Sequence, residues 1–174
     1  MKKVFVFACV AILASCSSNT SEKADSTKMA QDSTAITAEN ISSPYQINYS
    51  SKFVMDNPKN AETLLTLGKD WDSGNLSAHK DLFADSVEMH FSDGTSMHTS
   101  RDSAVAAAQS ERSAMATAVS SVDAIMAVKS TDKNPKWALI WGKGIDTEKK
   151  GVVDSFKLQE TWRFNKDGKA DLFF

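Results

Sequence analysis

The segment 152–164 most constrains what this chain can fold into, because apolar and polar side chains alternate along it. One set of alternate positions is mostly apolar and holds Phe156, Leu158, Trp162 and Phe164. The other set is polar and holds Lys157, Gln159, Thr161 and Arg163. A period of two residues is typical of a strand with one face against a core and the other facing water. The segment therefore predicts a long strand in a sheet that is covered on one side.

Further segments predict the rest of this sheet, and they lie at 85–91, 95–99, 117–129, 137–146 and 169–174. Asp93-Gly94 and the run 165–168 contain the residues that tight turns prefer, so we expect the chain to reverse there. In 137–146 the larger side chains, Trp141 among them, alternate with alanine and glycine. These segments predict antiparallel strands joined by hairpins.

Helices are predicted before most of the strands. Asn57-Pro58 is a helix start, and Gly74 suits the left-handed position that ends a helix. We expect a short second helix over 77–83 and a third that Ser100 caps and that runs to about Ser113. Helices followed by antiparallel strands predict an α+β fold, with about three helices packed on one face of a curved sheet.

The N-terminus predicts export. Two lysines precede an apolar run, Val4 to Leu13, that is too short to span the roughly 30 Å hydrocarbon core of a bilayer. The stretch Leu13-Ala14-Ser15-Cys16 resembles the lipobox of bacterial lipoproteins. That resemblance implies that residues 1–15 are a signal peptide and that Cys16 carries lipid. The alternative is an ordinary secreted protein with a cysteine at this place by chance.

The same resemblance implies a location and a partner. Ser17, rather than an aspartate, follows the cysteine, so lipid at Cys16 would attach the protein to the outer membrane of a Gram-negative envelope. From Cys16 to residue 43 small polar residues dominate, which predicts a lipidated flexible tether. The segment 44–174 is then the folded domain.

Composition excludes several classes of site. Cys9 leaves with the signal and Cys16 is modified, so the mature chain has no thiol for a disulfide, a nucleophile or a metal. The formal net charge of −2 offers no attraction to nucleic acid. The three histidines lack metal-ligand spacing, and no phosphate-binding glycine loop occurs. We therefore expect neither a metal nor a cofactor.

Several short motifs occur in a fixed order along the domain: Trp71-Asp72-Ser73-Gly74-Asn75, Leu82-Phe83-Ala84-Asp85, Asp93-Gly94 and Trp162-Arg163-Phe164. With the order of elements they resemble the nuclear transport factor 2-like superfamily, which includes ketosteroid isomerases and polyketide cyclases. The resemblance covers roughly 57–174. It implies a cystatin-like α+β cone, a curved antiparallel sheet around about three helices. It also implies an apolar pocket at the open end and a homodimer formed through the convex face.

The isomerases of that superfamily use an aspartate base and a tyrosine that donates to the developing oxyanion. Without gaps, the base position falls on Phe91 and the tyrosine position on Leu67. Neither side chain can transfer a proton, so the resemblance does not carry this chemistry over. A slip of one residue would place His90 or Ser92 in the pocket instead.

Glu160 lies on the apolar face of the segment 152–164, between Leu158 and Trp162. Desolvation there would raise its pKa, which is the condition for a general acid or base. The alternative is a carboxylate at the sheet rim or a dimer seam, paired with a lysine or arginine. His90 is a second, weaker candidate base, and it shares a strand face with Glu88.

The predicted pocket for a small apolar ligand is lined by Met89, Phe91, Trp141, Phe156 and Trp162. Aromatic residues at alternate strand positions also occur as plain core, which is the structural alternative. Two functions therefore stay open. One is a non-catalytic binding or interaction domain at the envelope. The other is an isomerase, cyclase or dehydratase with Glu160 or His90 as a relocated acid or base.

Overall fold

The computed structural model describes residues 41–174. The predicted signal peptide, the lipidation site Cys16 and the predicted tether up to residue 40 lie outside the described residues. Within 41–174, neither helix has both the length and the apolar character needed to cross a membrane.

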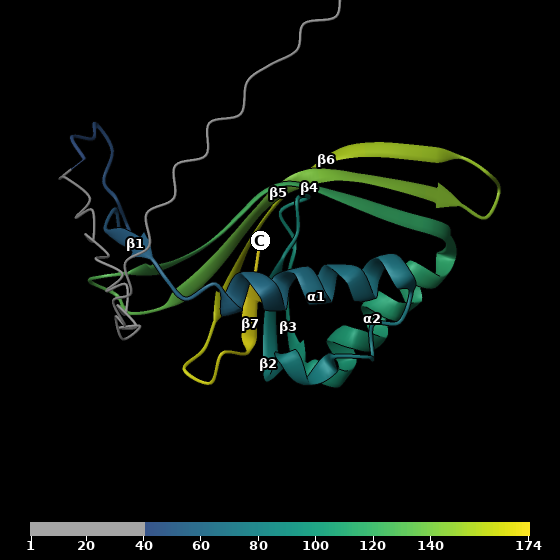
Figure 1. The fold of residues 1–174 in the computed structure, drawn as a ribbon, viewed down its shortest axis with the longest axis horizontal. Coiled ribbons are helices and arrows are strands. Elements are labelled where there is room, and N and C mark those ends of the chain that lie inside the picture. The colour runs from purple at the N-terminus through teal and green to yellow at the C-terminus, as the bar shows by residue number, and fades with distance from the viewer. Residues whose placement is uncertain (1–40) are drawn as a thin grey trace, which may run out of the picture. The chain divides into compact units, whose positions relative to one another are not determined.

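The described chain is α+β, with seven strands in one curved, unclosed sheet and two α-helices (Figure 1). In chain order the elements are β1 (Phe53–Met55), α1 (Lys59–Ser73), a 3-10 turn (Lys80–Leu82), β2 (Phe83–His90), β3 (Ser96–Ser100), α2 (Arg101–Ala114), β4 (Met115–Ser130), β5 (Lys136–Glu148), β6 (Val153–Phe164) and β7 (Ala170–Phe173). This confirms the predicted fold class.

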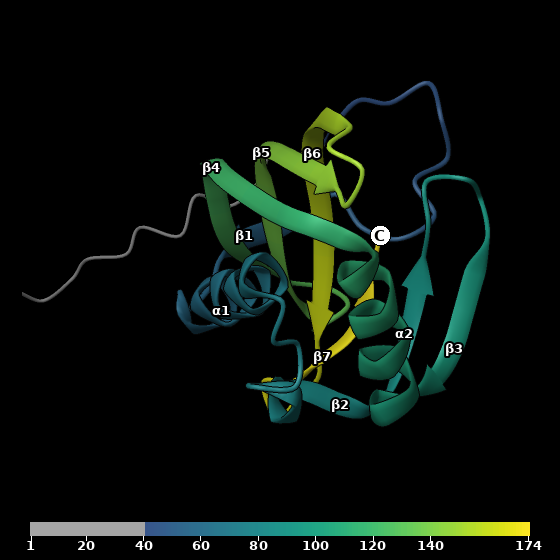
Figure 2. The same cartoon turned by 90° about the vertical axis from the view of Figure 1, so that its right-hand side faces the viewer.

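The sheet has the strand order β1-β4-β5-β6-β7-β2-β3. Its neighbours are antiparallel except β2 and β7, which run parallel. The long strands β4, β5 and β6 bend over α1 and α2, so both helices lie on the concave side (Figures 1 and 2). The bend creates the space in which a site can form.

The helix prediction over 77–83 was wrong, because only the 3-10 turn Lys80–Leu82 forms there. The last residue of the predicted helix, Phe83, instead begins β2, where its ring centroid lies 5.9 Å from that of Trp162. The remaining residues are too few to offset the cost of helix nucleation. The fold therefore has two α-helices instead of about three.

The predicted ends of the two α-helices agree with the structure to within one residue, and α1 begins at Lys59 with Pro58 at its N-cap. The side chain of Asn57 accepts the backbone N–H of Lys59 at 2.9 Å, and Ser100 accepts that of Ser103 at 3.3 Å. Gly74 ends α1 with φ of 74°, a left-handed conformation that favours glycine. These caps fix where each helix stops against the sheet.

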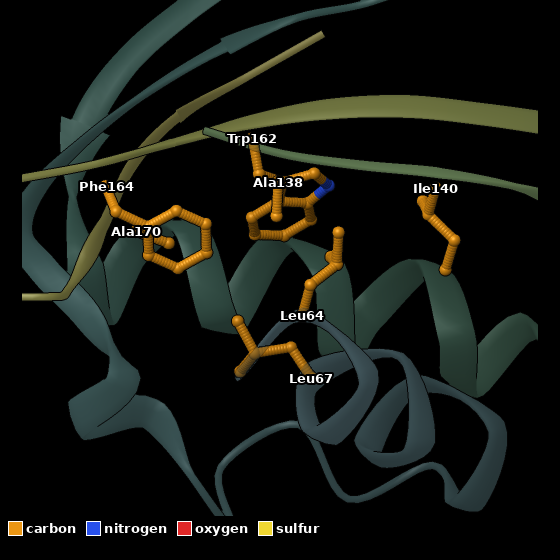
Figure 3. Close-up of a cluster of buried hydrophobic side chains, with 7 residues drawn as sticks. All are labelled: Leu64, Leu67, Ala138, Ile140, Trp162, Phe164 and Ala170. Atoms are coloured by element: carbon orange, nitrogen blue, oxygen red, sulfur yellow. The ribbon is translucent and has the colours of Figure 1, made fainter. Parts of the chain in front are cut away.

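The core seals one end of the concave face. It consists of Leu64 and Leu67 from α1 and of Ala138, Ile140, Trp162, Phe164 and Ala170 from the sheet. Figure 3 shows the side chains of the sheet pointing toward those of α1. Phe164 is only 2% exposed, so the side chains are closely packed at this end.

The concave face of β5 carries its small residues. Ala138, Gly142 and Gly144 are buried there with Ile140, so Trp141 lies on the opposite, convex face. Close packing explains the glycine at 144, since a Cβ there would come within 2.3 Å of the Phe156 ring. The bulky side chains of β5 are consequently on the outside of the curve.

Candidate ligand cavity

A cavity of about 670 Å³ lies between α1, α2 and the concave face of the sheet. Most of its lining is apolar, including Leu64, Leu67, Met89, Ile140, Trp162 and Phe173. Its volume is in the range of about 300–1,000 Å³ that is usual for small-molecule sites. The geometry therefore offers a largely apolar, open-mouthed space of ligand size.

Along β6 the concave side chains become more exposed from the sealed core toward the opening. Phe164 and Trp162 are 2% and 8% exposed, Glu160 and Leu158 are half-buried, and Phe156 is 39% exposed. Glu160 consequently lies at the inner end of the cavity, next to the core. Phe156 lies toward the mouth.

Glu160 is held in place by its neighbour Trp162. The indole Nε1–H of Trp162 donates to Oε2 of Glu160 at 2.8 Å, and the indole itself stacks on Phe173 with ring centroids 4.7 Å apart. Burial raises the pKa of the Glu160 carboxyl, and the hydrogen bond from Trp162 opposes this more weakly. Within residues 41–174 Glu160 forms no ion pair, which argues against a rim carboxylate paired with a lysine or arginine.

A second titratable group lies on β5. Asp146 lines the cavity, and burial is the main cause that raises its pKa. Asp154, which is directly opposite on β6, and Asp72 raise it further, while Arg112 lowers it. Asp146 was not among the site residues predicted from the sequence. Asp146 lies two and four residues after Gly144 and Gly142, so all three share one face of β5. The sequence would have indicated its place in the cavity only if this face had been recognised as the concave one.

Arg112 and Asp72 fix the region where α1 ends. The guanidinium of Arg112 donates to the backbone carbonyls of Trp71 and Asp72 at 2.8 and 3.0 Å. The carboxylate of Asp72 accepts the backbone N–H and the hydroxyl of Ser120 on β4 at 3.3 and 2.8 Å. These contacts tie α1, α2 and β4 together beside the cavity.

Four of the five predicted pocket residues line the cavity: Met89, Phe91, Phe156 and Trp162. Trp141 does not, and its expected place in the pocket was wrong. Both faces of β5 carry apolar residues, so alternation alone does not show which face meets the helices. In the structure the face with the smaller side chains meets them. Leu67 also lines the cavity, so both positions aligned with the isomerase pair, Phe91 and Leu67, lie there as apolar groups.

His90 does not line the cavity. It shares the outer face of β2 with Glu88, and its Nε2 lies 2.9 Å from the Glu88 carboxylate. Its ring stacks on that of Phe174 with centroids 4.8 Å apart. Of the two candidate bases, the structure thus brings only Glu160 to the cavity.

A second carboxylate–imidazole pair links the last turn of α1 to the segment after it. Both carboxylate oxygens of the buried Asp70 lie 3.0 Å from Nδ1 of His79. The pair holds the end of α1 against the segment that follows. In the described part of the chain, no three acidic, histidine or cysteine side chains are grouped so as to hold a metal ion.

No family model matches the sequence, and no curated protein matches it. Solved structures do match the fold. A nuclear transport factor 2-like protein of unknown function from Burkholderia pseudomallei has a TM-score of 0.53 at 19% identity, covering 66% of this chain and 87% of its own. Another, from Exiguobacterium sp. 255-15, has a TM-score of 0.52 at 16% identity, covering 64% and 93%.

An uncharacterised cystatin fold protein from Novosphingobium aromaticivorans has a TM-score of 0.52 at 11% identity, covering 66% of this chain and 94% of its own. These identities are too low to carry an activity across, and the matches concern the fold. Together with the observed arrangement of helices and sheet, they show that this chain has the nuclear transport factor 2-like fold.

Proposed function

We propose that the folded domain binds a small, largely apolar molecule without transforming it, and that lipid on Cys16 holds it at the cell envelope. The observation that supports binding is the cavity of about 670 Å³, which lies between both helices and the sheet and is lined mainly by apolar side chains. The anchor rests on the lipobox-like stretch Leu13-Ala14-Ser15-Cys16. No cofactor is part of the proposal.

The cavity suits binding for an energetic reason. Its apolar lining gains little from contact with water, so a ligand that removes apolar surface from water is stabilised by about 25 cal/mol per Å². After the cost of association, a drug-sized apolar molecule would bind with a dissociation constant in the micromolar range, about −8 kcal/mol.

The second candidate function is an isomerase, cyclase or dehydratase with Glu160 as its acid or base. The raised pKa of the Glu160 carboxyl inside the cavity favours it. Proton transfer next to a carbonyl also needs a group that stabilises the developing oxyanion. The two positions aligned with the isomerase pair hold Phe91 and Leu67, which supply no such group. Binding alone is therefore the better supported function.

Filling the cavity tests the binding proposal. Leu158 faces the cavity from β6 and Gln159 is exposed on the other face of the same strand. We expect Leu158→Trp to abolish the fluorescence gain of a solvatochromic apolar probe, while Gln159→Trp leaves it unchanged. Circular dichroism of both variants checks the fold. If the fluorescence gain is lost equally in both variants, or is retained in Leu158→Trp, the cavity is not where the probe binds.

Glu160→Gln separates binding from catalysis. If the domain only binds, the wild type does not turn over cyclic ketones or polyketide-like substrates, and Glu160→Gln retains binding of a neutral apolar probe. Turnover by the wild type that Glu160→Gln abolishes, and that Glu62→Gln on the surface of α1 retains, would establish Glu160 as the acid or base. Proton exchange next to the ketone, followed by NMR, is the most sensitive assay.

A further inference from the structure

The charged residues that line the cavity are almost all acidic. They are Asp70, Asp72, Glu111, Asp146 and Glu160. Lys69 is the one basic residue among the lining residues of the described chain. Asp70 is engaged by His79 and Asp72 by Ser120, which leaves three carboxyl groups available from α2, β5 and β6.

Neighbouring charges act on Asp146, and they would act on any bound molecule as well. Asp72 and Asp154 both raise the pKa of Asp146, after the larger effect of burial, and Arg112 opposes them. In a space walled by apolar side chains such charges act over a longer range than in water. A ligand with a carboxylate or phosphate would be repelled, and a cationic ligand would be attracted.

Glu160 supplies the specific contact. Its Oε2 already accepts the Trp162 indole N–H, and this is its only hydrogen bond within residues 41–174. The stacking of Trp162 on Phe173 fixes the orientation of the carboxyl group. The other oxygen, Oε1, therefore has a defined position and a free capacity to accept hydrogen bonds at the inner end of the cavity.

We infer that the ligand of this cavity is a cationic amphiphile, an apolar body that carries a protonated amine, with the ammonium bound to Oε1 of Glu160. The apolar body lies against Leu158, Ile140 and Met89, which line the same space. The inference rests on the proposed function, since it names the class of molecule that the cavity binds. A charge-assisted hydrogen bond to a partly desolvated carboxylate is the strongest polar contact available there.

Three probes with one apolar body test this inference. Each has a naphthalene ring on a two-carbon arm that ends in an amine, a hydroxyl or a carboxylate. Calorimetric titration uses the chain from Ser17 to Phe174, without the lipid that would require detergent. At neutral pH we expect the amine to bind about tenfold more tightly than the alcohol, as one charge-assisted hydrogen bond allows, and the carboxylate to bind most weakly.

Two matched variants assign the preference to Glu160. Glu160→Gln removes the charge and keeps an oxygen that can accept the Trp162 N–H. This variant should bind the amine no more tightly than the alcohol. Its dissociation constant for the alcohol should stay within about twofold of the wild-type value. Glu62→Gln removes one negative charge from α1 outside the cavity lining and should keep the tenfold preference.

Acidic pH gives an independent readout. Protonation of Glu160 removes the charge that holds the ammonium, so the preference for the amine should fall as the pH is lowered. Other charged residues also line the cavity, namely Lys69, Asp70, Asp72, Glu111 and Asp146. The part of the pH effect that is due to Glu160 is therefore the difference between wild type and Glu160→Gln.

The outcomes separate the inference from the proposed function. If the alcohol binds and the amine has no advantage, or if the advantage survives in Glu160→Gln, the inference is wrong and the cavity is still a binding site. If the alcohol binds more tightly than the amine, Glu160 is protonated and acts as a donor, which also overturns the inference. If none of the three probes binds, the proposed function fails as well.

Discussion

Glu160 shows how the position of one residue on a strand decides its chemistry. On β6 it shares the concave face with Leu158 and Trp162, its carboxyl group accepts one hydrogen bond from Trp162, and burial raises its pKa. Strand alternation alone predicted this face correctly, because the residues on either side of Glu160 in the same set are large and apolar. The same reasoning failed for Trp141, since apolar residues occupy both faces of β5.

The raised pKa of Glu160 predicts a pH-dependent stability. Glu160 binds its proton more tightly in the folded state than in the unfolded state. Below the unfolded pKa of about 4.3 the carboxyl group is protonated in both states, and it does not lower the free energy of unfolding. As the pH rises through that value toward the raised pKa, the folded state loses stability. Glu160→Gln should therefore unfold at higher denaturant concentration than wild type at neutral pH and at the same concentration near pH 3–4.

Urea unfolding at several pH values measures this difference. Glu62→Gln, exposed on α1, serves as the control: it loses a surface ion pair with Lys59 and a favourable charge in the first turn of the helix, so at neutral pH it should be slightly less stable than the wild type rather than more stable. A Glu160→Gln variant that is less stable than wild type at neutral pH would mean that the ionised carboxyl makes a stabilising contact.

At the scale of elements, close packing of β5 against its neighbours shapes the cavity. Gly142 lies opposite the bulge of β4 between Val122 and Ala124, and a Cβ there would meet the backbone oxygen of Ser121 at 2.1 Å. Gly144 instead lies under the ring of Phe156. A backbone cannot move aside as a half-exposed side chain can.

Alanine at these two glycines should therefore have different costs. We expect Gly142→Ala to destabilise the fold by about 1–3 kcal/mol, the usual cost of overpacking, and Gly144→Ala by less. Phe156→Ala in the background of Gly144→Ala should add no further loss, because the crowded ring is gone. Denaturant unfolding of the three variants is the measurement, and an equal cost at both glycines would show that the Phe156 ring cannot move.

The sequence predicted the elements better than their pairing. Helix caps at Asn57, Gly74 and Ser100 and the turn at Asp93-Gly94 are local signals, and the structure confirms them. The three-residue strand β1 and the parallel pairing of β2 with β7 depend on contacts between residues far apart in the chain. The face of β5 that meets the helices, and with it the role of Asp146, depends on the same long-range packing.

At the scale of the whole molecule, the convex face of the sheet is the surface that the helices leave uncovered. The family resemblance implied a dimer through this face, and the polar side chains of β6 there, Lys157, Gln159, Thr161 and Arg163, would make its seam polar. The structure adds an apolar part on β4 and β5, which consists of Val119, Met126, Leu139, Trp141 and Ile145. Val119 is 57% exposed, which leaves apolar surface for a partner to cover.

We predict that two copies pair through this convex face and bury about 800 Å² on each. Met126→Glu places a charge in the apolar part and should convert the dimer to a monomer, whereas Val152→Glu at the β5–β6 turn should not. Light scattering at micromolar concentration should give twice the monomer mass for the wild type. A monomeric wild type would reject the dimer.

The envelope anchor is a prediction for the N-terminal segment. We expect Cys16→Ala to abolish labelling by radioactive palmitate and to leave the precursor uncleaved, because the lipid attaches to the cysteine thiol before the signal is removed. The wild type should fractionate with outer membranes. An unlabelled wild type would show that Cys16 is not lipidated.

The most direct test of the account asks where an apolar ligand contacts the protein. Methyl NMR of the chain from Ser17 to Phe174, titrated with the naphthalene alcohol, reports on both faces of the sheet in one experiment. Met89, Ile140 and Leu158 line the cavity, and Leu139 and Ile145 lie on the convex face. The account predicts shifts in the first three methyl groups and none in the other two. Shifts confined to Leu139 and Ile145 would contradict it.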